Sequence, residues 1–312
     1  MKIRLRKLGN TGIKVSEVAL GTVSLGVNYG IQCYQQTSQP SEEEAIRMIH
    51  AAIEAGVNLI DTAPNYGIAE RLVGKGISGT ECMVATKIGV PGDGIINNQE
   101  LIKTIETSLE SSRRALKRDY IDIVQVHNMT LNNLADGRVG DFMEKLQNEG
   151  KIKVLGVSVY TEEEALWAIK SGWVKVLQIP FNLLDQRMTK RVFAASERVG
   201  IGIIGRSVFL KGALTEKVEW LPENLSALRS RIKGIQNKLG LSVENLRTMA
   251  LKFCLYDERL SSVLLGPGNM AELEKAINDS FSESLSADMF QKVCDVAVND
   301  PDLVDPRIWG IP

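Results

Sequence analysis

The sequence has few histidines and cysteines and no excess of charge of either sign. It contains two histidines in 312 residues, and its four cysteines are far apart and form no C-x-x-C pair. Zinc sites need several such ligands at close spacing, so no metal site is predicted. The formal net charge is -1 with acids and bases interspersed, which leaves no basic surface for nucleic acid or an anionic membrane.

Long hydrophobic runs are also missing. No apolar stretch is long enough to span a bilayer, and the opening MKIRLRKLGNTG carries charge without the hydrophobic segment of a secretion signal behind it. We therefore expect a cytoplasmic protein with small-molecule partners, and the sequence does not indicate an oligomeric state. Hydrophobic residues make up 44% of the chain and no low-complexity linker divides it, so a single domain over residues 1–312 is predicted.

Short strand-like runs alternate with longer amphipathic segments from residue 18 onward. The amphipathic segments carry helix signals: PSEEEAIRMIHAAIEAG begins with a Pro-Ser cap and ends at Gly56, and TEEEALWAIKSG ends at Gly172. The strand-like runs are almost continuously apolar, as parallel strands buried on both faces are. Eight such units predict an α/β protein with a (β/α)8 TIM barrel. The predicted strands span residues 17–22, 58–63, 82–87, 120–127, 154–159, 176–181, 202–207 and 262–266.

Three segments extend this repeating pattern. Residues 3–18 alternate around an Asn-Thr-Gly turn and predict an N-terminal β-hairpin that closes the bottom of the barrel. Residues 24–40 and 210–240 are longer than the connections require and predict long loops at the C-terminal face. Two matches to G-x-G-x-x-G, at residues 74–79 and 200–205, do not predict a Rossmann site, because the first follows a helix and the second leads into a strand.

Polar residues lie at the carboxyl ends of the predicted strands, where barrel enzymes place their chemistry. Asp61, Lys87 and His127 end the second, third and fourth strands. Neighbouring strands lie about 4.8 Å apart, so these side chains are expected within roughly 10 Å of one another. Tyr66 follows Asp61 closely enough to lean over them. The other strand ends carry Thr22, Ser158, Gln178, Arg206, Ser207 and the loop 266–269.

This group of residues predicts proton transfer. A nearby ammonium favours a phenolate and a buried carboxylate keeps that ammonium charged, so Asp61 and Lys87 are expected to lower the pKa of Tyr66. Tyr66 would then act as general acid and base, with His127 orienting a carbonyl. Plainer interpretations exist: a structural ion pair, a core histidine and a packing tyrosine. Joint occurrence at successive strand ends favours the catalytic interpretation.

The same segments resemble the aldo-keto reductases in family order over nearly the full chain. The motifs are LGT, DTAPNYG, ATK, YIDIVQVHN, GKIKVLGVS, LQIPFNLLD and RSVFLKGAL, from the first strand to the seventh. The resemblance places the family's catalytic tetrad on Asp61, Tyr66, Lys87 and His127. It implies an NAD(P)H-dependent oxidoreductase that reduces a carbonyl to an alcohol, with the cofactor extended across the barrel mouth.

The resemblance also implies the cofactor contacts. Ser158 and Gln178 are expected to hold the nicotinamide carboxamide, the loop 206–212 to cradle the pyrophosphate, and the loop 266–272 to surround the adenosine. Near the nicotinamide ribose it places Gly21, Thr22, Val23 and Asp61. The cofactor residues expected in the two loops are Arg206, Ser207, Phe209, Lys211, Gly212, Gly266, Gly268, Asn269 and Glu272.

The chain departs from the family pattern at several of these positions. Val159 stands where Asn is frequent, and Arg206 where an aromatic often stacks on the nicotinamide; a guanidinium plane can substitute for it. Glu272 replaces a base or Gln, Ala276 replaces Asn, and the loop lacks the basic residue that commonly clamps the 2′-phosphate. A carboxylate at this place favours a ribose hydroxyl. NADP(H) is expected as the commoner family cofactor, with NAD(H) as the alternative.

The substrate hypothesis is a polar carbonyl, such as that of a sugar or sugar nucleotide. Val23 and Ser24 replace the aromatic that often follows the first strand, which leaves a more polar wall. NYGIQ and RSVFLKG also resemble relatives linked to carbohydrate pathways. The expected substrate-binding residues are Ser24, Tyr29, Asn65 and Asn128, with the C-terminal PRIWGIP nearby.

Two other functions remain open. The first is a nicotinamide-binding regulatory subunit without significant turnover, as in the potassium-channel β subunits, which have this fold and use it to bind a partner. Alternatively, Lys87 would be a Schiff-base nucleophile in an aldolase-like barrel, which an adjacent Asp61 disfavours by keeping the amine charged.

Overall fold

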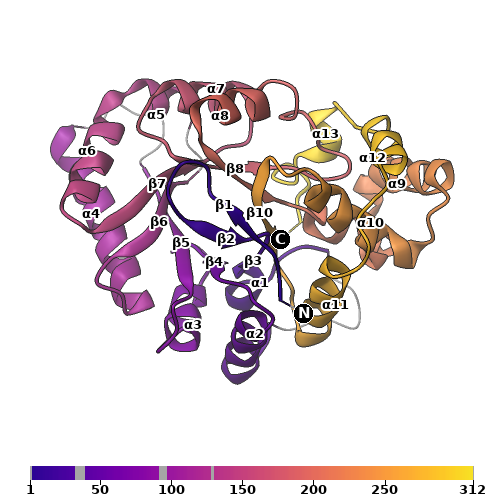
Figure 1. Cartoon of the computed structure of the whole chain (residues 1–312), viewed down its shortest axis with the longest axis horizontal. Helices are drawn as coiled ribbons and strands as arrows, with labels where there is room; N and C mark the ends of the chain where they lie inside the picture. Colours follow the sequence, from indigo (N-terminus) through magenta and orange to yellow (C-terminus); the bar gives the residue numbers. More distant parts are fainter. Residues whose placement is uncertain (1, 32–38, 91–96, 128–129, 312) are drawn as a thin grey trace.

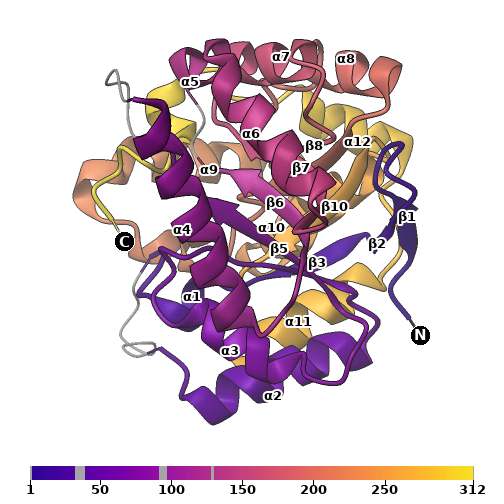
Figure 2. The ribbon, with the colours of Figure 1, turned by 90° about the vertical axis from the view of Figure 1, so that its left-hand side faces the viewer.

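The computed structural model describes residues 2–31, 39–90, 97–127 and 130–311. In this part of the chain, eight parallel strands form a closed barrel in the order β10-β3-β4-β5-β6-β7-β8-β9, surrounded by helices (Figures 1 and 2). The predicted (β/α)8 TIM barrel is confirmed. The barrel strands are β3 (Val18–Gly21), β4 (Leu59–Asp61), β5 (Met83–Ile88), β6 (Ile121–Val126), β7 (Ile152–Ser158), β8 (Val176–Pro180), β9 (Gly202–Arg206) and β10 (Leu260–Leu265).

The helices begin at the capping signals that the sequence carries. The Ser41 hydroxyl accepts a hydrogen bond from the Glu44 amide at the start of α2 (Glu42–Glu54), and Thr161 forms a capping box with Glu164 at the start of α7 (Glu162–Lys170). Both contacts satisfy amides that have no partner within the helix. The other helices are α1 (Val23–Gly26), α3 (Ala69–Gly76), α4 (Asn98–Leu116), α5 (Leu131–Ala135), α6 (Gly137–Asn148), α8 (Val192–Val199), α9 (Ser226–Leu239), α10 (Val243–Tyr256), α11 (Met270–Ser280), α12 (Ala287–Cys294) and α13 (Pro301–Val304).

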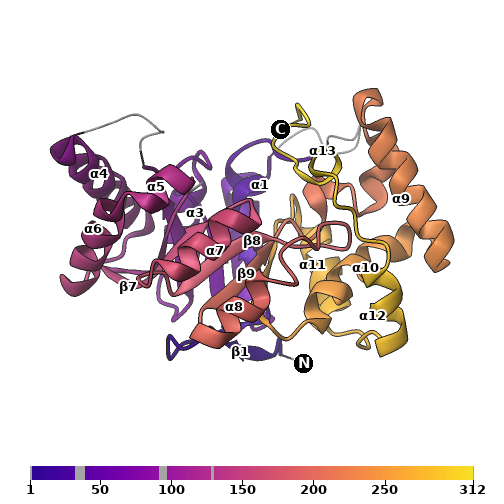
Figure 3. The ribbon, with the colours of Figure 1, turned by 90° about the horizontal axis from the view of Figure 1, so that it is seen from above.

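The predicted N-terminal hairpin is present and closes one end of the barrel. It consists of β1 (Leu5–Lys7) and β2 (Lys14–Ser16), which pair antiparallel. The hairpin contributes Leu8, Ile13 and Val15 to a separate apolar cluster, which also contains one buried residue from each of seven barrel strands, among them Leu59 and Ile204. Figure 3 shows the hairpin at the end opposite α1, α13 and the C-terminus, so the other mouth of the barrel is free to carry a site.

The other end of the barrel carries the long connections. After β9 the chain makes the short 3-10 helices η1 (Leu210–Gly212), η2 (Glu216–Trp220) and η3 (Glu223–Leu225) before α9. The C-terminal segment is anchored over this region, because Lys211 Nζ donates to the Ile311 carbonyl at 2.8 Å and Asn224 Nδ2 to the Trp309 carbonyl at 3.2 Å. Part of the first long connection, residues 32–38, lies outside the described residues.

Within the described ranges, no helix has the length and apolar character needed to cross a membrane.

Candidate active site

A buried ion pair joins the ends of two neighbouring barrel strands. Asp61 ends β4 and pairs in register with Ala85 of β5, so Lys87, two residues further along β5, reaches across to it. Lys87 Nζ donates to Asp61 Oδ2 at 2.6 Å and to the Thr62 carbonyl at 3.0 Å. The two residues are 1% and 3% exposed. The ammonium is therefore held inside the barrel rather than in solvent.

The second carboxylate oxygen of Asp61 is bound by two amides. Gln178 Nε2 donates to Asp61 Oδ1 at 2.7 Å and Gln125 Nε2 at 3.3 Å. Gln125 faces Lys87 in the register of β5 and β6, and it was not predicted from the sequence. One N–H of the Gln178 amide is thus committed to Asp61, and its second N–H and its side-chain oxygen remain for a ligand.

Tyr66 and His127 lie next to this ion pair. Lys87 Nζ is 5.1 Å from the centroid of the Tyr66 ring. The Tyr66 and His127 rings meet edge to face, with centroids 6.5 Å apart at an interplanar angle of 86°. The structure therefore brings the four residues of the predicted tetrad together, although Lys87 sits behind the others and only Asp61, Tyr66 and His127 line the pocket itself.

The pKa of Tyr66 is raised, whereas the sequence predicted that it would be lowered. Burial raises the pKa of Tyr66, while the charges of Lys87 and Arg206 act to lower it, and the net direction is upward. The expected lowering is therefore wrong in direction: Lys87 has the predicted effect, but desolvation of the phenolate outweighs it. The phenol keeps its proton at neutral pH.

The two basic residues of the tetrad have opposite charge states. Burial opposes the charge of Lys87, but Asp61 and Tyr66 outweigh it and raise the pKa of the ammonium, so Lys87 stays charged. Burial, followed by repulsion from Lys87 and Arg206, lowers the pKa of His127 to about 3. His127 is therefore neutral near pH 7 and can donate one hydrogen bond without carrying charge.

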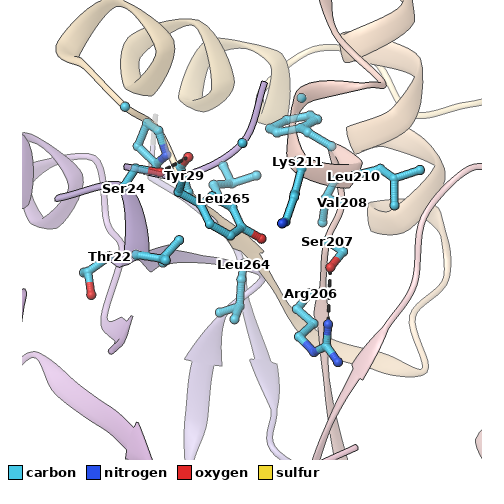
Figure 4. A pocket seen from close by; sticks show the side chains of 18 of the residues that line it. Thr22, Ser24, Tyr29, Arg206, Ser207, Val208, Leu210, Lys211, Leu264 and Leu265 are labelled. Atoms are coloured by element: carbon cyan, nitrogen blue, oxygen red, sulfur yellow. Dashed lines mark hydrogen bonds between the residues drawn. The ribbon is translucent and has the colours of Figure 1, made fainter. Parts of the chain in front are cut away.

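The tetrad opens into a cavity of about 390 Å³ at the barrel mouth. Figure 4 shows other residues of its wall, among them Thr22, Tyr29 and Lys211. Of the residues expected to contact a cofactor, all but Asn269 line this cavity; Asn269 instead caps α11, where its Oδ1 accepts from the Glu272 amide at 2.9 Å. Ser24, Tyr29 and Asn65 line it as well, whereas Asn128 lies outside the described residues. The two groups of predicted residues thus share one pocket.

One wall of the cavity has a strained backbone. Ser207, Leu210 and Lys211 have φ values of 61°, 47° and 54°, and Gly212 follows at 99°. Left-handed conformations are costly for residues other than glycine and are concentrated at functional sites. Gly30 packs against this turn so closely that a Cβ on it would lie 2.7 Å from the Lys211 carbonyl oxygen. Successive backbone amides in such turns make concave anion sites.

Arg206 is held between backbone and aromatic groups in the same pocket. Its Nη2 donates to the Val159 carbonyl at 3.2 Å, and its Cζ lies 3.8 Å from the centroid of the Tyr160 ring. The Arg307 guanidinium lies 3.7 Å from the same ring centroid. Figure 4 shows Arg206 beside Ser207, to whose hydroxyl its Nη1 donates at 3.4 Å. Neither Tyr160 nor Arg307 was identified individually from the sequence.

The far end of the cavity is formed by the loop before α11 and by two cations. Glu272 Oε2 accepts from the Gly268 amide at 2.8 Å, and Glu272 Oε1 lies 2.8 Å from Lys217 Nζ. Arg247, on α10, also lines this end. Lys217 and Arg247 were missed because both are distant in sequence from the loop that they approach, and only the fold brings them there.

No set of three His, Cys, Asp or Glu side chains suitable for a metal ion occurs among the residues that the structure describes. Cys82, Cys254 and Cys294 are free thiols, and Cys33 falls in a range that the structure does not describe.

Comparison with known proteins gives a consistent result. The model of the Aldo/keto reductase family matches residues 17–297. L-galactose dehydrogenase of Arabidopsis thaliana is 29% identical over 296 residues, which cover 88% of each chain. The oxidoreductase YqkF of Bacillus subtilis is 26% identical over 305 residues, covering 91% of this chain and 93% of the relative.

Two solved structures share the fold. The holo form of aldo-keto reductase AKR11C1 from Bacillus halodurans superposes with a TM-score of 0.79 at 24% identity, covering 96% of this chain and 97% of that one. The glycerol dehydrogenase AKR11B4 from Gluconobacter oxydans superposes with a TM-score of 0.72 at 24% identity, covering 94% of each.

Proposed function

The chain belongs to the Aldo/keto reductase family and is an NAD(P)H-dependent oxidoreductase, and we propose that it reduces a polar carbonyl to an alcohol with Tyr66 as general acid and base. The observation that carries this proposal is the buried Asp61–Lys87 pair, with its N–O distance of 2.6 Å, directly behind a phenol that lines the pocket. A structural ion pair needs no such phenol and no neutral histidine beside it.

The proposed role of Tyr66 is to give its proton to the carbonyl oxygen. With a raised pKa, Tyr66 holds that proton at neutral pH, and the charge of Lys87 stabilises the phenolate as the proton leaves. Asp61 keeps Lys87 charged and fixes its direction. His127, neutral and within the same pocket, donates to the carbonyl oxygen where negative charge develops. A reduced nicotinamide, when bound, supplies the hydride for the carbonyl carbon.

The pocket suits an extended nicotinamide dinucleotide. Ser158 and Gln178 line it beside the tetrad, where they would hold a carboxamide. The strained turn from Ser207 to Gly212 presents the kind of backbone that binds pyrophosphate. The loop before α11 lines the far end, where it would surround the adenosine.

Lys87 is poorly placed to act as a Schiff-base nucleophile. It is 1% exposed, donates to Asp61, and has a raised pKa, so the neutral amine that such chemistry needs is disfavoured.

The test of the proposed mechanism is Tyr66→Phe. Steady-state oxidation of NADPH with a small aldehyde is expected to fall by about 100-fold to 10,000-fold, because a positioned general acid contributes about that much. Cofactor binding, measured by quenching of protein fluorescence, is expected to be unchanged. Tyr120→Phe is the control, because Tyr120 is 44% exposed at the outset of β6. Full activity in Tyr66→Phe would contradict the role of Tyr66, and a wild-type protein that binds NADPH without turnover would favour the regulatory subunit.

The proposed substrate class is a hydroxylated carbonyl such as a sugar. The pocket wall carries Ser24, Tyr29 and Asn65, and L-galactose dehydrogenase and glycerol dehydrogenase, by their names, act on hydroxylated compounds. Glyceraldehyde and propanal form a matched pair, since they share a three-carbon chain and differ in two hydroxyl groups. A kcat/KM about 5-fold to 100-fold higher for glyceraldehyde is expected from one or two new hydrogen bonds. Equal or better use of propanal would refute this substrate class.

A further inference from the structure

Gln125 is a buried amide behind the active site, and the proposed mechanism does not use it. It lies on β6, is fully buried, and is not one of the described residues that line the cavity. On the same strand it stands two residues before His127 and two residues after Ile123, which belongs to the apolar cluster at the closed end of the barrel. Gln125 therefore does not touch a substrate, and any effect on the reaction must pass through another residue.

One contact fixes the direction of the Gln125 amide. Its Nε2 donates to Asp61 Oδ1 at 3.3 Å, whereas its Oε1 is buried and has no hydrogen-bond partner among the described residues. If the amide were rotated by 180°, Oε1 would face the carboxylate, and two acceptors repel each other. The donor is thus directed at Asp61 even though the acceptor stays unsatisfied.

The interior of the barrel is shaped to hold this side chain. In the register of the strands, Gln125 lies between Lys87 on β5 and Gly156 on β7. A Cβ on Gly156 would lie 3.1 Å from Gln125 Cγ, so the glycine leaves space that the longer side chain occupies. A buried acceptor without a partner lowers stability, and an apolar side chain of similar shape would not have this effect. Such departures from an apolar interior are expected at functional sites.

Asp61 is the residue through which Gln125 can act. Asp61 Oδ2 binds the Lys87 ammonium at 2.6 Å, and Asp61 Oδ1 accepts from Gln178 at 2.7 Å and from Gln125. Gln178 lines the cavity and is proposed to hold the carboxamide, so its amide serves a ligand as well as Asp61. Gln125 lies outside the cavity wall. It therefore supports the carboxylate independently of what the cavity contains.

We propose that Gln125 is a positioning residue that holds the Asp61 carboxylate on Lys87. It does so whether or not a cofactor engages Gln178. This inference rests on the proposed function, because it takes Tyr66 to be the residue that gives up a proton.

The expected effect on the reaction is a loss in kcat. The charge of Lys87 acts to lower the pKa of Tyr66, and it stabilises the phenolate as the proton leaves. Without Gln125, Asp61 is held less firmly, and the ammonium is no longer fixed beside the phenol. The cavity wall is unchanged, so the binding of substrate and cofactor should not weaken.

The test is Gln125→Met, which removes the amide and keeps an unbranched side chain of similar length. For reduction of glyceraldehyde by NADPH, kcat should fall by about 3-fold to 10-fold, the effect of one hydrogen bond on a rate. The KM for glyceraldehyde and the Kd of NADPH, measured by calorimetry, should not change. In urea, the unfolding midpoint should stay the same or rise, because the unsatisfied acceptor is removed.

Three further variants make the result specific. Gln178→Met removes the other amide on Asp61 Oδ1, but Gln178 lines the cavity, so it should also weaken NADPH binding, by about 3-fold to 10-fold. Ile123→Val alters packing on the same face of β6 and should leave kcat unchanged. In an Asp61→Asn background, Gln125→Met should cause no further loss of kcat, because both act through one group.

Gln125→Asn decides the matter if the Met variant does not fold. It keeps an amide that is one methylene too short to reach Asp61, so the same fall in kcat is expected.

Four results would overturn the inference: wild-type kcat in a folded Gln125 variant, a weakening of NADPH binding in Gln125→Met as large as that in Gln178→Met, an equal fall in kcat in Ile123→Val, or additive losses with Asp61→Asn. A wild-type protein without turnover, or full activity in Tyr66→Phe, would instead overturn the proposed function, and those outcomes are distinct from the four.

Discussion

Asp61→Asn is a direct test of whether the buried ion pair holds the site together. In the wild-type protein, Lys87 Nζ lies 2.6 Å from Asp61 Oδ2, and both side chains are almost fully buried. The substitution keeps the shape of the side chain and an oxygen for the two Gln amides, but it removes the negative charge. Lys87 is then a buried ammonium without a compensating carboxylate.

The expected loss of stability is about 3 to 5 kcal/mol at pH 7, the usual result of removing one partner of a buried ion pair. The loss should depend on pH. Asp61 and Tyr66 hold the wild-type pKa of Lys87 above its unfolded value, so this contribution is complete below about pH 10.4 and is lost as the pH rises through the folded pKa. In Asp61→Asn burial dominates and the pKa of Lys87 falls, so the variant gains stability as the pH rises toward about 10.4. The gap between the two proteins should therefore narrow between pH 7 and pH 10.

Urea unfolding of both proteins from pH 6 to pH 10 measures this gap. Asp61→Asn combined with Lys87→Met is the partner experiment, because replacing both charges by uncharged groups should restore most of the stability while activity stays lost. Glu149→Gln breaks the exposed pair with Lys151 and should leave the unfolding midpoint nearly unchanged. A loss below about 1 kcal/mol in Asp61→Asn, or a gap that does not vary with pH, would refute the reasoning.

Three other predictions concern particular residues. Because the pKa of His127 is lowered to about 3, the unfolded chain binds a proton there below about pH 6.5 while the folded chain does not. The free energy of unfolding should therefore fall from pH 6.5 toward pH 3 by up to about 1.4 kcal/mol per pH unit. In urea titrations, His127→Gln should flatten this slope, whereas His50→Gln, at an exposed site, should not. A Cβ on Gly26 would lie 1.8 Å from the Tyr66 carbonyl oxygen, so Gly26→Ala should displace Tyr66 and reduce kcat. Gly234→Ala, in α9, should leave kcat unchanged, because a Cβ there meets nothing within 4 Å and the backbone is helical. Leu8→Ala at the closed end of the barrel should cost about 2 to 5 kcal/mol in unfolding free energy without altering the Kd of NADPH; a changed Kd would show that the hairpin influences the distant mouth.

The barrel was predictable because its signals are local and repeated. Ser41 and Thr161 cap helices where the sequence places them, and each apolar run became a strand. Strand limits were less accurate: residues 58–63 were expected where β4 spans Leu59–Asp61, and residues 262–266 where β10 spans Leu260–Leu265. The limits of a strand depend on which neighbours complete its hydrogen bonds, and a single segment does not show them.

The tetrad was also within reach of the sequence, since parallel strands bring their carboxyl ends to one face. Residues that approach the site from other parts of the fold could not be predicted in this way. Gln125 precedes His127 by two residues on β6, yet its bond to Asp61 depends on the register of three strands. The direction of the Tyr66 shift depends on how much of the surrounding chain covers the phenol. The place of Arg247 depends on how α10 packs against α11.

The closure of the barrel has a consequence for synthesis of the protein. Asp61, Tyr66, Lys87 and His127 all belong to the first half of the chain, but β3, which flanks β4, completes its hydrogen bonding only when β10 pairs with it through Val263–Leu265. A growing chain on the ribosome that already contains every tetrad residue still lacks β10, the last strand of the barrel that encloses them. Fragments ending before residue 260 should accordingly be inactive, and supplying the missing portion as a second polypeptide is the way to recover turnover.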